Sequence, residues 1–588
     1  MTVRAGELRP SQAVSQSGPG SLVDLPTVSM IMSGIDDWNQ STARRVDEPR
    51  LARRLRVDTF REPPYFRTAD GSGGLPARVF PKLLVCPRCN RLAPHDHFEF
   101  EPGGPRHLCK SPACSGAGKA VAYPARYMVA CPRGHLSDFP WHSYVHPQGV
   151  VCSEELKLED TGRTGAITDI WIKCEKHSVS KNLGQAFGSA GRKRLPRCAA
   201  ERPWFGDVDP SGCTEQPRVL LRGASNAYFP VVESAISIPP WSDPIQVALG
   251  SYFDQLAKVD SLEKLDMWLE LTNAPELDGF PPAQLWEALS RRRGGDQSRV
   301  SLKEEEWRAF QTTSVKIDAK SEFKARSADT PSELEGWVDR VLLIERLREV
   351  RALRGFTRID PVPDVGDLDD VEAVRAGLAP IRKVVSSWLP AVDFRGEGIL
   401  ILLKEDRIRA WEASDAVRPM AELLQRSDRA WHAARGLEVH GDHSVRFVLL
   451  HSLSHLVIRQ LALDCGYSSA SLRERIYSSR QASTSMAGIL IYTATPDAEG
   501  SLGGLVEQGR PESLGPLVER ALFDAHLCAN DPLCADRVIG EGAGQMNGAA
   551  CHACLLISET ACEAGNHYLD RGALVPTLRD APYAFITG

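Results

Sequence analysis

The stretch Gly548-Ala-Ala-Cys-His-Ala-Cys554 lies near the end of the 588-residue chain and contains a Cys-x-x-Cys pair. Three further cysteines, Cys528, Cys534 and Cys562, lie close by in the sequence. A Cys-x-x-Cys turn lets two thiolates reach one ion, and a second pair completes the tetrahedron that zinc prefers. Buried thiols can instead act as small apolar side chains. Five cysteines so close together favour a structural zinc site, around which the C-terminal part would fold.

Length and composition predict a soluble protein of about three domains. Apolar residues make up 42% of the chain and charged residues 25%, as in ordinary globular proteins. The formal net charge of −6 excludes a generally basic nucleic-acid binder. Any contact with DNA must therefore come from local basic patches or from a partner.

The apolar runs predict a cytoplasmic protein with no membrane association. No apolar signal segment follows Met1, and the longest runs, such as Gly398-Ile-Leu-Ile-Leu-Leu403, are too short to span a bilayer. The 15 cysteines are odd in number and cluster with histidines, so metal binding explains them better than disulfides.

The cysteines also divide the chain, because none lies between Cys213 and Cys465. The predicted fold is an α+β multidomain protein: an N-terminal zinc-ribbon-like region over residues 1–235, a mainly helical middle region over 236–395, and a C-terminal mixed α/β zinc-binding module over 396–588.

Two metal sites are predicted in the N-terminal region. Cys86-Pro-Arg-Cys89 follows a strand-like segment at 82–85 and precedes Cys109 and Cys114, which is the spacing of a zinc ribbon built on two hairpins. The second predicted set has three cysteines and one histidine: Cys174, His177, Cys198 and Cys213. A further set fits no standard spacing, and its use as ligands stays open: Cys131, His135, His146 and Cys152.

The basic loop Gly191-Arg-Lys-Arg-Leu-Pro-Arg197 lies within this metal-rich region. It is either a contact to phosphate or a solvated loop.

Hydrophobic periodicity predicts the remaining elements. Helices are expected over 331–353, 444–463, 471–479 and 512–526. Strands are expected over 398–403 and 408–411, joined by a turn, and over 487–493.

His451 and His455 share one face of the helix predicted over 444–463 by sequence spacing, and this raises an enzymatic alternative. A metal-dependent nuclease or hydrolase would use Asp442, His443, His451 and His455. The zinc-protease motif, however, requires glutamate directly after the first histidine, and Ser452 stands there. A packed or hydrogen-bonded histidine pair is therefore favoured. The sequence contains neither a GxxxxGK[ST] phosphate loop nor a GxSxG elbow, so the chain is predicted not to be an enzyme.

Several motifs, taken in order, resemble the DrmB family of the DISARM anti-phage system. They are Arg9-Pro-Ser-Gln12 with Gly18-Pro-Gly20, Cys131 to Trp141, Gly223-Ala-Ser-Asn-Ala-Tyr-Phe-Pro230, Leu347-Arg-Glu-Val350 with Gly355-Phe-Thr-Arg358, and Asn547 to Cys554. The resemblance covers nearly the whole chain, and the order of the motifs carries it.

The resemblance implies a non-catalytic zinc subunit that associates with a separate helicase subunit, DrmA, and helps engage phage DNA. It also implies that residues 398 to 571 are similar to a zinc-binding module of certain DNA-repair helicases, so an accessory subunit of a repair helicase is a further alternative. By position, the C-terminal zinc ligands would be Cys528, Cys534, Cys551 and Cys554, with Cys562 competing for one place.

Overall fold

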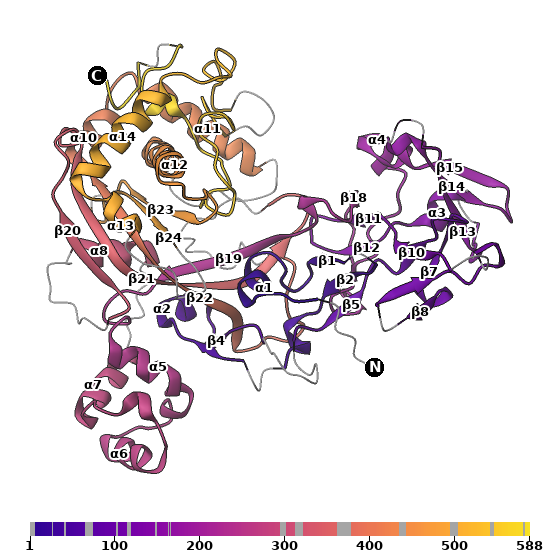
Figure 1. Cartoon of the computed structure of the whole chain (residues 1–588), viewed down its shortest axis with the longest axis horizontal. Helices are drawn as coiled ribbons and strands as arrows, with labels where there is room; N and C mark the ends of the chain where they lie inside the picture. Colours follow the sequence, from indigo (N-terminus) through magenta and orange to yellow (C-terminus); the bar gives the residue numbers. More distant parts are fainter. Residues whose placement is uncertain are drawn as a thin grey trace.

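The computed structural model of the protein describes residues 6–25, 27–39, 43–64, 74–101, 104–114, 119–146, 150–162, 164, 166–293, 301–311, 321–361, 378–433, 443–481, 483–493, 504–540, 546–579 and 582–587. Helices and strands are mixed along this part of the chain (Figure 1). Their buried apolar side chains form several separate cores. The predicted α+β multidomain class is confirmed.

An antiparallel sheet of eight strands organises the N-terminal metal-binding region (Figure 1). In spatial order its strands are β15 (Val179–Asn182), β14 (Ile170–Cys174), β13 (Leu156–Asp160), β7 (Arg91–Pro94), β6 (Leu83–Val85), β10 (Val121–Pro124), β9 (Arg106–Leu108) and β8 (Glu99–Glu101). The short helices α3 (Trp141–Val145) and α4 (Gly188–Arg192) belong to the same region. Strand β6 contains most of the strand predicted at 82–85.

Two small three-stranded sheets connect this region to the rest of the molecule. One contains β1 (Leu22–Asp24), β2 (Ser29–Met32) and β5 (Ala77–Val79). The other contains β12 (Leu136–Asp138), β11 (Tyr127–Ala130) and β18 (Arg218–Leu221). A two-stranded ribbon is formed by β16 (Glu201–Arg202) and β17 (Asp207–Val208).

The largest sheet runs through the middle of the molecule and is built on two long strands (Figure 1). These are β21 (Val338–Thr357) and β22 (Trp388–Leu403), which pair antiparallel with Val341 opposite Ile401. The sheet also contains β19 (Phe229–Ile236), β20 (Lys324–Ala328), β23 (Leu472–Ser479), β24 (Met486–Thr493), β3 (Arg45–Val46) and β4 (Thr59–Arg61). One end of β22 pairs with β4 and the other with β24, so it passes through the domain boundary predicted at 395/396.

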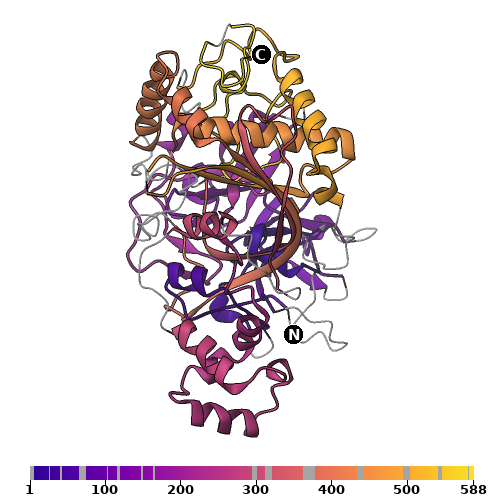
Figure 2. The same cartoon turned by 90° about the vertical axis from the view of Figure 1, so that its left-hand side faces the viewer.

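Three helices of the middle region form a unit that projects from the molecule (Figure 2). These are α5 (Pro244–Leu256), α6 (Leu262–Leu271) and α7 (Pro282–Arg293), which enclose their own small core. The next helix, α8 (Leu302–Gln311), packs on the large sheet through Trp307 and Phe310. Helices therefore fill much of 244–311, and strands follow from β20.

A long buried helix, α12 (Val445–Cys465), lies at the centre of the C-terminal module (Figure 1). It begins at Ser444, whose side chain accepts a hydrogen bond from the Phe447 amide, and ends at the left-handed Gly466. It is surrounded by β23, β24 and the residues after 546, together with α10 (Glu405–Glu412), α11 (Arg418–Ala433), α13 (Gly504–Gln508) and α14 (Pro511–Ala525). Apolar residues all round α12 explain its central position.

Four predicted elements of the C-terminal half are confirmed: the helices at 444–463 and 512–526, and the strands at 398–403 and 487–493, correspond to α12, α14, the end of β22 and β24. Three others are wrong. Residues 338–353 form strand β21 rather than a helix, because both faces of this strand are buried and buried charged residues such as Arg348, Glu349 and Arg351 hide the two-residue alternation.

The other two errors lie next to α12. Residues 408–411 belong to helix α10, where Ile408 and Trp411 are three residues apart on its buried face. Residues 472–479 form strand β23 rather than a helix. Its charged Glu474 and Arg475 are buried on opposite faces of the sheet, so polarity does not mark the exposed positions.

A fully buried arginine, Arg358, joins several distant loops. Its Nε donates to the Gly134 carbonyl at 2.9 Å, its Nη2 donates to the Gly20 carbonyl at 2.7 Å, and its Nη1 donates to the Ala227 carbonyl. Burial lowers the pKa of Arg358 to about 9. Gly20, Gly134 and Ala227 each belong to a motif that carries the family resemblance, and Arg358 ends a fourth. Arg358 therefore joins four of these motifs.

Candidate metal centres

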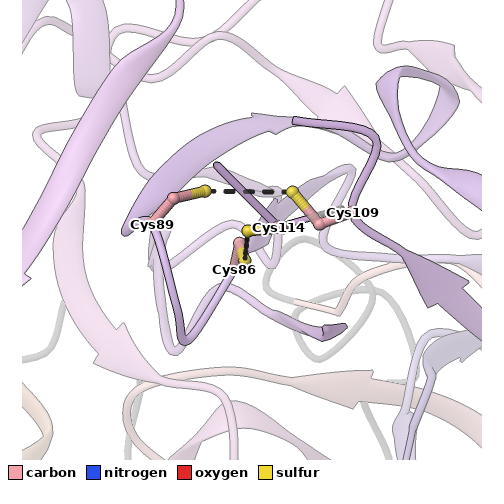
Figure 3. A group of neighbouring side chains, drawn as sticks. All are labelled: Cys86, Cys89, Cys109 and Cys114. Atoms are coloured by element: carbon pink, nitrogen blue, oxygen red, sulfur yellow. Dashed lines mark hydrogen bonds between the residues drawn. The ribbon is translucent and has the colours of Figure 1, made fainter. Parts of the chain in front are cut away.

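The first candidate centre brings Cys86, Cys89, Cys109 and Cys114 together, as the spacing predicts (Figure 3). Cys86 and Cys89 lie in the turn of the β6–β7 hairpin, and the other two lie between the paired strands β9 and β10. The turn closes through Asn90, whose backbone is left-handed and whose amide donates to the Cys86 carbonyl at 3.0 Å. This is the two-hairpin arrangement of a zinc ribbon.

The sulfur spacing fits a metal ion rather than disulfides. The Sγ atoms of Cys86 and Cys114 are 3.6 Å apart, and those of Cys89 and Cys109 are 3.8 Å apart. A disulfide needs about 2.05 Å. A zinc–sulfur bond of about 2.3 Å in a tetrahedron places neighbouring sulfurs about 3.8 Å apart.

The second centre contains Cys131, His135, Cys198 and Cys213. Cys131 Sγ lies 3.4 Å from His135 Nδ1 and 3.9 Å from Cys213 Sγ. The other ring nitrogen of His135 lies 3.1 Å from an oxygen of Asp209. Burial alone would raise the pKa of Asp209, but bonds from Ser211 and His135 lower it to about 2. The carboxylate therefore holds the imidazole with Nδ1 toward the sulfurs, as in metal-bound histidines.

The third centre contains His146, Cys152, Cys174 and His177. Cys174 Sγ lies 3.3 Å from His177 Nδ1 and 3.9 Å from Cys152 Sγ. His146 Nδ1 donates to the His142 carbonyl at 2.8 Å, which leaves its Nε2 lone pair directed toward the group, 3.2 Å from His177 Nδ1. Two nitrogen and two sulfur donors are a common zinc set.

The predicted set of Cys174, His177, Cys198 and Cys213 is therefore wrong as a set. Its first two members join His146 and Cys152, and its last two join Cys131 and His135. Two long-range contacts decide this exchange. The pairing of β11 with β18 brings Cys131 toward Cys213, and the packing of α3 against β14 and β15 brings His146 toward Cys174. Sequence spacing contains neither contact.

The fourth centre brings Cys528, Cys534, Cys551 and Cys554 together at the end of α14. The Sγ–Sγ distances are 3.5 Å for Cys528–Cys551 and 3.7 Å for both Cys534–Cys554 and Cys551–Cys554. These distances again match the edges of a zinc–thiolate tetrahedron. Cys562, the predicted competitor, belongs to a different group.

A buried ion pair supports this fourth centre. Asp531 accepts hydrogen bonds from the amides of Cys528 at 2.8 Å and Ala535 at 3.0 Å. The fully buried Arg571 holds Asp531 through Nη2, at 2.6 and 2.8 Å from the two carboxylate oxygens. Its Nη1 donates to the Ala525 carbonyl at 2.6 Å, so Arg571 joins the last turn of α14 to the cysteine loop.

The residues of the enzymatic alternative do not form one site among the described residues. His443 is stacked on Tyr568 and lies 3.3 Å from Asp428. His451 and His455 instead meet Glu474 and Cys562. Asp442 lies outside the described residues. Glu474 was missed from the sequence because its strand was predicted to be a helix.

Each of the four candidate centres offers four protein donor atoms. Zinc that is bound by four protein ligands is typical of structural sites, whereas catalytic zinc keeps one position for water or substrate. The N-terminal centres join hairpins and loops, and the fourth joins α14 to the C-terminal loops. A metal ion bound in each centre would hold these segments together.

Comparisons with known proteins agree with this arrangement. Residues 9–229, which contain the first three centres, match a family described as a domain of unknown function, DUF8724. Residues 453–555, which contain the fourth, match the "MrfA Zn-binding domain". That match, with the four thiols, identifies zinc as the metal of this protein.

One relative covers almost the whole chain. It is the "DISARM protein DrmB" of Bacillus paralicheniformis, 32% identical over 95% of this chain and 98% of its own length. A solved structure of the DUF1998 helicase MrfA bound to DNA is similar to 36% of this chain and 22% of that chain, with 14% identity and a TM-score of 0.18. Within the described residues, none of the helices is both long and apolar enough to span a bilayer.

Proposed function

The chain belongs to the DrmB family of DISARM proteins, and from this premise we propose that it is a zinc-stabilised accessory subunit of a DISARM complex. In this proposal the chain binds a helicase subunit and helps to hold DNA. It acts in the cytoplasm and hydrolyses no ATP by itself.

The observation that carries the proposal is the position of the fourth zinc centre. Its cysteines lie beside the core that contains α12 and α14, within the segment that matches the MrfA Zn-binding domain. MrfA is described as a helicase bound to DNA. This chain contains a zinc module of the kind that MrfA contains, and this likeness supports association of the chain with a separate helicase subunit.

Exposed apolar side chains near this centre support a docking surface there. Phe523, Leu527 and Leu533 are 78%, 64% and 78% exposed and lie in the segment that leads into and forms the zinc loop. Large apolar side chains that gather on a surface are typical of protein–protein contacts. We assign the helicase contact to these three residues.

The basic loop at 191–197 is our candidate for the DNA contact. The hydrogen bonds of Arg192, Arg194 and Arg197 go to uncharged acceptors, the Gln216 carbonyl, the Gln185 side chain and the Thr214 carbonyl. Their positive charge is therefore not compensated by these bonds. By contrast, three lysines of the neighbouring hairpins, Lys157, Lys173 and Lys176, each pair with a glutamate. An uncompensated basic loop suits phosphate.

The proposal is tested by measuring the DNA affinity of the helicase subunit with and without this chain, by fluorescence anisotropy over a range of salt concentrations. The chain should increase the affinity and steepen the salt dependence, by roughly 0.9 in log–log slope for each phosphate contacted. Combined Lys193→Ala and Arg197→Ala substitutions should remove most of that gain. The matched control Lys176→Ala should keep it, because Lys176 pairs with Glu154.

Equal DNA affinity with and without the chain would contradict the DNA role, and ATP hydrolysis by the chain alone would contradict the accessory role.

The docking surface is tested separately, in a pull-down with the helicase. Leu533→Ser should weaken capture at least tenfold, whereas Leu271→Ser, at an equally exposed position on α6, should not.

A further inference from the structure

A fifth group of metal-binding side chains lies inside the C-terminal module, apart from the four cysteine-rich centres. It contains His451 and His455 from α12, Glu474 from β23 and Cys562 from the loop before the C-terminus. The two histidines are four residues apart, so they project from one face of the helix toward the strand. The side chains of His451, His455 and Glu474 are fully buried.

The donor atoms of the four residues converge on one point. His451 Nε2 lies 3.0 Å from Glu474 Oε1 and 3.1 Å from Cys562 Sγ. His455 Nε2 lies 3.3 Å from the same Glu474 oxygen. All four donor atoms lie within 4.8 Å of one another. The two imidazole rings are nearly perpendicular, at 82°, so that their Nε2 atoms approach the point from different directions.

This arrangement differs from a cysteine–histidine–carboxylate relay. In such a relay the histidine contacts the nucleophile with one ring nitrogen and the carboxylate with the other. Here His451 meets both Cys562 and Glu474 with the same nitrogen, Nε2. Its Nδ1 is buried and has no hydrogen-bond partner among the described residues. The geometry therefore favours a shared cation over proton transfer along a chain.

The hydrogen bonds around the group also fit a positive charge at its centre. His455 Nδ1 donates to the Leu555 carbonyl at 2.9 Å, so in the neutral ring Nε2 carries a lone pair. That lone pair faces the Glu474 carboxylate, which also accepts from the Glu563 amide at 3.0 Å. Cys562 Sγ accepts from the amides of Ala564 at 3.3 Å and Asn566 at 3.2 Å, as a thiolate does.

We propose that His451, His455, Glu474 and Cys562 bind one zinc ion, in a buried site that joins α12, β23 and the C-terminal loop. Two neutral imidazoles, a carboxylate and a thiolate are all zinc ligands, and the two negative charges balance Zn²⁺. The Leu555 carbonyl that orients His455 follows Cys554 directly, so this site and the fourth centre share one segment of chain. The proposal does not depend on the helicase or DNA contacts.

The direct test is an anomalous difference map from crystals of the full chain, with data collected above and below the zinc absorption edge. A peak between the four donor atoms, present only above the edge, is the expected result. Its absence there, while the tetracysteine centre shows a peak, would overturn the proposal, since the group would then be a hydrogen-bonded cluster. A peak with the absorption edge of iron or copper would also overturn it.

Zinc content per chain, measured by mass spectrometry of the purified protein, gives a second readout. His451→Ala should contain one zinc ion fewer than the unmodified chain. The control His443→Ala should lose none, because this buried histidine contacts Asp428 and belongs to no metal group among the described residues. Unchanged zinc in His451→Ala would contradict the site. If that variant does not fold, the anomalous map of the unmodified chain decides alone.

Discussion

Replacing Arg571 by alanine tests how the fourth zinc centre is held together. The guanidinium is fully buried and holds the Asp531 carboxylate, which in turn fixes the Cys528 and Ala535 amides. The substitution leaves a carboxylate that is only 4% exposed without its cation. Removing one partner of a buried pair costs about 3–5 kcal/mol. This total includes the smaller cost of losing the hydrogen bond to the Ala525 carbonyl.

The assay is urea unfolding followed by tryptophan fluorescence, because Trp411 and Trp431 both lie in the core of this module. With an m-value of about 2–3 kcal/mol/M, a loss of about 3–5 kcal/mol lowers the unfolding midpoint by roughly 1–2.5 M urea. Zinc release to a chelator should accelerate in parallel, since the cysteine loop is no longer fixed by Asp531.

The matched control is Arg520→Ala, which removes a solvent-accessible ion pair between Arg520 on α14 and Asp464 on α12. Such a pair contributes about 0–1 kcal/mol. If Arg571→Ala unfolds at the same urea concentration as Arg520→Ala and releases zinc at the same rate, the account of the centre is refuted.

Three more predictions concern stability. Glu306→Ala should destabilise the protein by about 3–5 kcal/mol in urea unfolding, because it leaves the buried Arg475 of β23 without its carboxylate partner. Glu304→Ala, which breaks a more exposed pair with Arg308, should change the free energy of unfolding by less than about 1 kcal/mol. Cys554→Ser should give insoluble or protease-sensitive protein, since a structural zinc site contributes roughly 10–16 kcal/mol in small peptides. The control is Cys465→Ser, because Cys465 is exposed and belongs to no predicted metal site. A soluble Cys554→Ser protein with an unchanged melting curve would contradict the site. Burial alone would raise the pKa of Asp393, but neighbouring arginines lower it from 3.8 to about 2. About 2 kcal/mol of stability, fully present above about pH 5, should therefore be lost as the pH falls toward 2. Asp393→Asn should lack this part of the acid dependence, and an equal loss of stability with falling pH in both proteins would contradict the prediction.

How much the sequence predicts depends on whether the contacts are local. Cys86 with Cys89 and Cys551 with Cys554 are close in sequence, and each pair lies where its spacing predicts. Helix α12 has enough length and capping to be predicted without knowledge of its neighbours. The family resemblance, which depends on the order of several motifs, is confirmed by the relative that covers 95% of the chain.

The errors come from long-range contacts and burial. Strand β21 is buried on both faces and contains buried charged residues, so its polar and apolar residues do not alternate as in a half-buried strand. The partners of Cys131 and His146 are decided by strand pairing and helix packing that spacing does not encode. The spacing of His451 and His455 predicts part of the fifth group, because it places both on one face of a helix. Glu474 joins them through the packing of β23 against α12, which spacing does not encode.

The most direct test of the proposed accessory role is to co-purify this chain with the helicase subunit of the same defence system and to weigh the complex by native mass spectrometry. The account predicts a complex that contains both chains, with zinc bound to this one. It also predicts that Leu533→Ser reduces complex formation while Leu271→Ser does not. Recovery of this chain alone, zinc-loaded and folded but separate from the helicase at micromolar concentrations, would contradict the account.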